Sequence, residues 1–123
     1  MDWHLSNDKP IYLQLIDQIK RQILAGRYDA GSSFPSVRDL AADAAVNPNT
    51  MQRALAALEQ QGLLVGSRTN GRTVTSDASL LSCMREELAR DAYLQFFHAL
   101  TELGFSREEM HTFLQSELHK EEL

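Results

Sequence analysis

The stretch from residue 35 to residue 64 constrains the fold most strongly, because it carries the start and stop signals of two consecutive short helices. Ser36 is a preferred N-cap residue for the first helix. Asn47 can cap the second helix, and Pro48 then occupies its first position, where no N–H donor is needed. Gly62 supplies the left-handed residue that ends this helix. The stretch is therefore predicted to form a helix–turn–helix.

The second of these helices has two chemically different sides. At about 100° per residue, Met51, Leu55 and Leu58 fall together as a buried stripe. The opposite side carries two amides, a guanidinium and a methyl group, on Asn49, Gln52, Arg53 and Ala56. Amides and guanidinium groups pair with purine edges in the major groove of DNA, and a methyl group can meet thymine. The alternative is the polar face of any soluble helix, and the hairpin that follows favours DNA.

A β-hairpin is predicted directly after Gly62. Leu63–Arg68 and Arg72–Thr75 can form two short strands, and Asn70-Gly71 between them is a strong hairpin signal. Arginines flank the tip, so the hairpin could grip phosphate or enter the minor groove as a wing. By itself it could equally be an ordinary surface turn.

An amphipathic helix is predicted before this region, opening near Pro10 and ending at Gly26. Its apolar stripe, with Ile11, Leu15, Ile19 and Ile23 at intervals of four residues, should pack across the helix–turn–helix. Phe34 is expected to anchor a short strand. The fold class is mainly α with a small β-hairpin.

Charge and composition exclude several classes of protein. The formal net charge is −5, but the chain is balanced through Asp77 and the whole excess lies beyond it. Negative charge there can stay away from phosphates, so the sum does not argue against DNA binding. The single cysteine, Cys83, is expected to be a small buried apolar residue in a reducing compartment. With no signal-peptide core and no apolar run of about 20 residues, we expect a soluble cytoplasmic protein without membrane contact.

The remaining residues are predicted to form two helices. The first runs from Asp77 to Gly104, and Ser106 with Glu109 makes a capping box for the second. Both carry wide apolar stripes, at Leu81, Met84, Leu88, Ala92, Phe96, Leu100, Leu103, Met110, Phe113 and Leu114. Two such helices cannot bury these stripes against each other alone, so a second copy is expected to complete a bundle. The alternative is a monomer whose tail folds back onto the first part.

Several segments together resemble the winged helix-turn-helix of the GntR family of bacterial transcription regulators. They are PIYLQLIDQI, PSVRDLA, NPNTMQRAL and EQQGLL, and the match covers about residues 9 to 76. The short remainder resembles the YtrA subfamily, in which a two-helix tail serves dimerisation. The resemblance implies a DNA-binding domain over 1–76 and a helical dimerisation region over 77–123.

The resemblance also implies DNA-contacting positions. In the first helix, Arg38 matches a typical DNA-contacting arginine, and the caps Ser36 and Asn47 match residues that can touch phosphate. Recognition-helix positions are matched by Asn49, Thr50, Gln52 and Arg53, and wing positions by Arg68, Asn70, Gly71 and Arg72. The family wing usually reads Gly-x-Gly; here one glycine is missing and an arginine is added.

Two function classes remain open. The first is a homodimeric transcription regulator, most simply a repressor that binds an inverted repeat in double-stranded DNA. The YtrA resemblance implies control of a transporter operon, and Tyr93, Phe96, Phe97 and Phe113 are candidate walls for an effector pocket. The second is a winged-helix module that binds another protein. Catalytic motifs and cofactor motifs are absent, so we expect no enzyme. The spacing of His98, His111 and His119 does not favour a metal site.

Overall fold

The computed structural model describes residues 1–67 and 71–121, and the chain divides into two compact units. Met1–Arg85 is here called the winged unit and Glu86–Leu123 the tail unit. The expected boundary lay earlier, between 76 and 77. The start of the long helix belongs with the winged unit because Leu80 packs there, so close to Gly62 that a β-carbon on the glycine would come within 3.2 Å of its Cδ2 atom.

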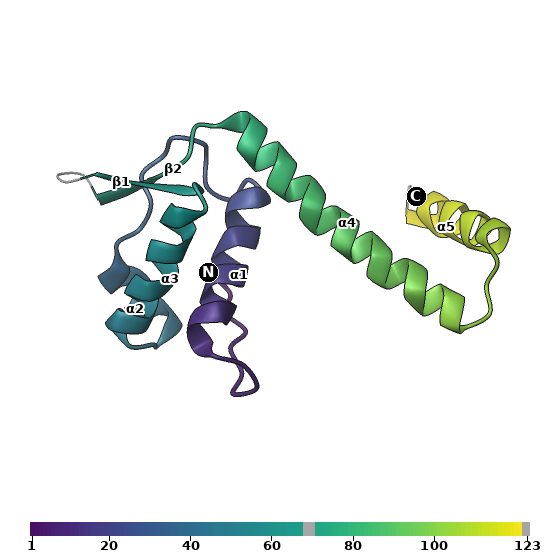
Figure 1. Cartoon of the computed structure of the whole chain (residues 1–123), viewed down its shortest axis with the longest axis horizontal. Coiled ribbons are helices and arrows are strands. Elements are labelled where there is room, and N and C mark those ends of the chain that lie inside the picture. The colour runs from purple at the N-terminus through teal and green to yellow at the C-terminus, as the bar shows by residue number, and fades with distance from the viewer. Residues whose placement is uncertain (68–70, 122–123) are drawn as a thin grey trace. The chain divides into compact units, whose positions relative to one another are not determined.

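The structure confirms a mainly helical chain with one hairpin (Figure 1). Its elements, in chain order, are α1 (Ile11–Leu24), α2 (Val37–Ala44), α3 (Pro48–Gln60), β1 (Leu64–Ser67), β2 (Gly71–Val74), α4 (Ala78–Glu102) and α5 (Arg107–Glu121).

The three helices α1, α2 and α3 enclose the core of the winged unit (Figure 1). α3 is central, since it packs against both α1 and α2. The fully buried side chains come from α1, α3 and the hairpin: Leu15, Ile19, Met51, Leu55, Leu58, Leu63, Leu64 and Val74. The predicted apolar stripes of α1 and α3 therefore face one another as expected.

The turn between α2 and α3 is built by an alanine in a left-handed conformation. Ala45 has φ 56° and ψ 47°, and its N–H donates back to the last turn of α2. In the left-handed region the β-carbon lies close to the following carbonyl oxygen, so this conformation costs more energy for alanine than for glycine. Gly62, with φ 84°, makes the equivalent stop after α3 without that strain.

The hairpin is antiparallel, and its register pairs Leu64 with Val74 and Gly66 with Arg72. In place of the strand expected near Phe34, a single bridge pairs Ser33 with Thr73. The N–H of Phe34 also donates to the carbonyl of Arg72 at 2.8 Å. The Phe34 ring is buried as expected, and Pro35, which lacks a donor, ends the pairing.

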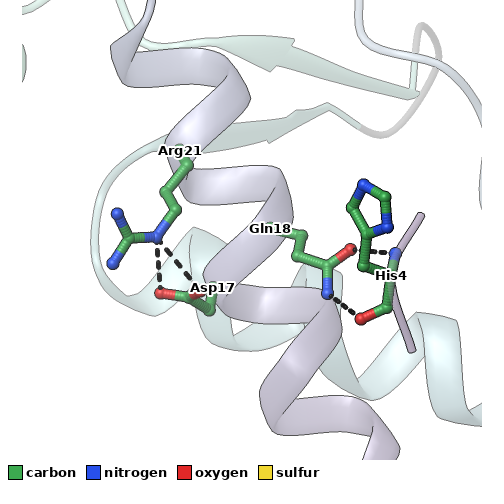
Figure 2. A network of polar contacts seen from close by, with 4 residues as sticks. All are labelled: His4, Asp17, Gln18 and Arg21. Carbon is green, nitrogen blue, oxygen red and sulfur yellow. Dashed lines mark hydrogen bonds and ion pairs between the residues drawn. The ribbon is translucent and has the colours of Figure 1, made fainter. Parts of the chain in front are cut away.

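Side chains of α1 and α2 hold the segment that precedes α1. The Gln18 amide pairs with the backbone of His4, accepting from its N–H at 3.0 Å and donating to its carbonyl at 2.8 Å (Figure 2). Gln14 makes similar bonds to the carbonyl and N–H of Ser6. The indole N–H of Trp3 donates to Asp43 at 2.8 Å, and this bond, followed by the chain's amino group, lowers the pKa of the Asp43 carboxyl.

The tail unit contains most of α4 and all of α5. Its predicted capping box is confirmed: Ser106 Oγ accepts from the Glu109 N–H at 3.1 Å, and the Glu109 carboxylate accepts from the Ser106 N–H at 2.9 Å. Of the described tail residues, only Leu100 and Met110 are buried. Cys83, on the part of α4 that belongs to the winged unit, was expected to be buried and is instead exposed.

Candidate nucleic-acid interface

The start of α3 is formed by the two residues that the sequence predicts there, Asn47 and Pro48. Asn47 Oδ1 accepts from the N–H of Asn49 at 2.8 Å, and Pro48 begins the helix. Four exposed side chains make up the outward face of α3, namely Asn49, Gln52, Arg53 and Ala56. Its polar groups can donate and accept hydrogen bonds in pairs, which is what base edges require in the major groove. Thr50 lies at the border of the face and is half-buried.

α2 contributes a charged residue close to the start of the helix–turn–helix. Ser36 Oγ accepts from the Asp39 N–H at 3.1 Å and so caps α2. Arg38 is exposed in the first turn of this helix. The structure thus brings Ser36 and Arg38 to one helix start, where N–H groups and a guanidinium are both suited to a phosphate.

The wing is attached to α3 by an ion pair that the sequence reasoning missed. The guanidinium of Arg72 on β2 pairs with the carboxylate of Glu59 in the last turn of α3. The side chain of Arg72 is only 16% exposed, and a β-carbon on its strand partner Gly66 would come within 3.0 Å of Glu59 Oε1. Glu59 therefore lies across the hairpin where a glycine leaves room for it, and Arg72 serves this junction in addition to any phosphate.

The other edge of the outward face is supported by α1. The guanidinium carbon of Arg53 lies 3.6 Å from the centre of the Tyr12 ring. Tyr12 was not among the residues predicted to contact DNA. The signal that could have found it is an aromatic residue on the α1 surface nearest α3, together with an arginine on α3.

Two residues of the predicted wing, Arg68 and Asn70, lie outside the described residues. Gly71, with φ 70°, begins β2. The structure places Asn49, Gln52 and Arg53 on one face of α3, with Arg38 on the preceding helix and Arg72 near the tip-side end of β2.

The tail carries a groove of about 240 Å³ within the tail unit. Three of the four aromatic residues expected to wall a pocket, Tyr93, Phe96 and Phe97, line it. Phe113 instead lies against Phe105, with ring centres 5.8 Å apart. Arg107 and His111 are the polar members of the groove wall.

Residues 1–67 and 71–121 contain neither a metal-ligating cluster nor a membrane-spanning helix. No group of three histidine, cysteine, aspartate or glutamate side chains in these ranges is placed to hold a metal ion. In the same part of the chain, no helix combines the length and the apolar character needed to cross a membrane.

Three helices, a cap-presented polar face and an attached hairpin define a winged helix-turn-helix. The model of the family described as bacterial regulatory proteins, gntR family, matches residues 11–74. This chain belongs to the GntR family of transcriptional regulators, whose winged helix binds DNA and whose members are regulators and not enzymes.

Individual relatives are similar to this chain over more than half of its length. The HTH-type transcriptional regulator YhcF of Bacillus subtilis is 34% identical over 110 residues, 89% of this chain and 91% of its own length. The repressor YtrA of the same organism is 39% identical over 69 residues, 56% of this chain and 53% of its own. A solved GntR family regulator from Listeria monocytogenes is 31% identical with a TM-score of 0.82, covering 91% of this chain and 98% of that chain.

Proposed function

We propose that the protein is a homodimeric, sequence-specific transcription repressor that binds an inverted repeat in double-stranded DNA in the cytoplasm. The observation that carries the proposal is the exposed face of α3 with Asn49, Gln52 and Arg53. On one side this face contacts α1 through Arg53, and α3 is joined to the wing by the ion pair at its last turn. Such a face fits the major groove, and its side chains match the donors and acceptors of base edges.

The remaining contacts in this proposal are to phosphate. Three residues would contact the DNA backbone from the helix starts, namely Arg38 and the caps Ser36 and Asn47. The wing would add contacts from Arg68, Asn70, Gly71 and Arg72. Contacts of this kind supply affinity that falls steeply with salt, while base contacts supply preference.

Dimerisation through the tail is proposed from its exposed apolar side chains. Leu103 is 73% exposed and Leu118 is 53% exposed, although both are leucines on helices or at their ends. Leaving such side chains in water forgoes about 25 cal/mol for each Å² that could be buried. A second copy of the chain would cover them, and two-fold symmetry would place two copies of α3 on two half-sites.

Repression, and a transporter operon as target, are proposals carried by family resemblance. The 39% identical YtrA is described as a repressor, and a dimer seated on a promoter would exclude polymerase. A small-molecule effector could enter the tail groove, whose aromatic walls suit an apolar ligand.

The test is selection of bound duplexes from a random DNA library at two salt concentrations, followed by sequencing. We expect enrichment of an inverted repeat, with binding that weakens steeply at higher salt. Absence of any enriched motif at low salt would contradict the proposal and favour the second function class, a winged-helix module that binds protein. If a motif is enriched, it serves to search promoters, including those of transporter operons.

A further inference from the structure

Tyr12 is joined to the outward face of α3 by a contact between helices that are far apart in sequence. The guanidinium of Arg53 lies over the Tyr12 ring at 3.6 Å from the ring centre. Arg53 is exposed, whereas Tyr12 is half-buried on α1. The ring is thus partly covered by the protein, and the exposed guanidinium lies over it.

This geometry orients the arginine without consuming its hydrogen-bonding groups. A guanidinium attracted to an aromatic ring uses its planar face, and its N–H donors point outward in the plane. A free arginine on a helix surface samples many rotamers and must give up this freedom when it binds. A guanidinium already held over a ring gives up less, which favours a bidentate contact of defined direction.

The helix that carries Tyr12 is anchored in the core of the winged unit. Leu15 and Ile19, which follow on α1, are fully buried, and α1 packs along α3. On the other edge of the outward face, Gln52 is exposed. The supported donor is thus at the α1 edge, and its support comes from a residue outside the helix–turn–helix.

We infer that Tyr12 is a positioning residue for base recognition, which holds Arg53 so that one position in each half-site requires guanine. Guanine is the base whose major-groove edge offers two acceptors, O6 and N7, to a bidentate guanidinium. The inference rests on the proposed function, since it names the element that sets preference at one base pair.

The experiment measures binding of the full chain to the duplex selected above and to duplexes carrying each other base at the guanine position. The variants are Tyr12→Leu, which removes the ring, and Tyr12→Phe, which keeps it as a matched control. Arg53→Lys retains the charge without the planar donor pair. Thermal melting of each variant reports folding, and binding to an unrelated duplex reports the phosphate contacts.

We expect the wild type to prefer guanine by roughly tenfold or more. Tyr12→Phe should retain that preference, while Tyr12→Leu and Arg53→Lys should each reduce it several-fold and change binding to the unrelated duplex by a smaller factor. In the double variant Tyr12→Leu/Arg53→Lys the losses should not add, because both single changes remove the same contact.

Three results would overturn the inference. One is an unchanged guanine preference in Tyr12→Leu. Another is an equal loss on all duplexes with a lowered melting temperature, which would make Tyr12 purely structural. A third is an unchanged preference in Arg53→Lys, a variant that remains informative if Tyr12→Leu fails to fold. A wild type that enriches no motif at all would remove the proposed function as well, and is therefore distinguishable from these outcomes.

Discussion

The winged unit and the tail unit bury their apolar side chains to very different extents. In the winged unit, leucines and isoleucines of α1, α3 and the hairpin are fully enclosed, as Leu15 and Leu58 are. In the tail unit, α4 and α5 make few contacts with each other, and Leu103 and Leu118 stand in solvent. The winged unit completes its own core, whereas the tail leaves several large apolar side chains exposed. This contrast is the reason to place partner binding in the tail and DNA reading in the winged unit.

The largest effect should come from opening the core of the winged unit. Leu58→Ala should lower the free energy of unfolding by about 2–5 kcal/mol, because Leu58 is 0% exposed and truncating its side chain leaves a cavity in the core. Urea unfolding followed by fluorescence of the single tryptophan, Trp3, measures this unit directly. Leu103→Ala is the matched tail variant and should leave the same transition nearly unchanged. Equal losses in both variants would break the comparison.

A charge placed on the tail should weaken the dimer. Leu114→Glu should raise the dimer dissociation constant at least tenfold, because one buried apolar side chain contributes about 1.5–3 kcal/mol and a buried charge costs more. Leu13→Glu is the control, because it places the same charge on a leucine of the winged unit with a similar exposed fraction: Leu13 is 47% exposed and Leu114 is 41% exposed. Sedimentation equilibrium of both variants measures the constant. A larger shift for Leu13→Glu would move the proposed interface to the winged unit.

Releasing the wing should have a smaller effect that is confined to the winged unit. Glu59→Gln leaves Arg72 without its carboxylate partner and should cost ~1 kcal/mol of stability, as expected for a partly buried ion pair. Amide exchange at Gly66 and Gly71 should accelerate more than exchange in α1. Reversing the pair, with Glu59→Arg and Arg72→Glu together, should recover part of the loss. Unchanged exchange in the hairpin would show that the pair does not hold the wing.

The smallest effect concerns pH and the start of α5. Hydrogen bonds from the backbone and then the side chain of Ser106 lower the pKa of Glu109 from its usual value. The folded-state pKa is therefore below the unfolded one, so the stabilisation is present above the unfolded pKa and is lost as pH falls through the folded value. NMR of the Ser106 amide should show the capping bond weakening in acid, as the pH falls below the ordinary pKa of a glutamate and through the lowered pKa of Glu109. In Glu109→Gln the same amide should not titrate in that range, and an identical titration there would contradict the assignment.

Local signals in the sequence predicted most of the fold. Ser36, Asn47, Pro48 and Gly62 act within a few residues of where they stand, so their caps and stops could be assigned from the sequence alone. The membership of the GntR family and the outward face of α3 followed from the same stretch.

The contacts that frame the interface could not be predicted in this way. Tyr12 with Arg53, and Glu59 with Arg72, join residues on different elements, and their pairing depends on how those elements pack. Arg72 was predicted only as a wing residue that grips phosphate or enters the minor groove, because sequence spacing cannot show that Gly66 admits a carboxylate beside it. Exposure of Cys83 was missed for a related reason, since composition favours burial and only the packing of α4 decides it.

Sedimentation of the unmodified full chain at micromolar concentration tests the central claim most directly. The claim is that an incomplete tail joins two complete winged units. It predicts a single species of twice the chain mass of 13.9 kDa, with no change on dilution across the micromolar range. A species of the single-chain mass at these concentrations would contradict it, because the exposed tail leucines would then have no second copy to cover them.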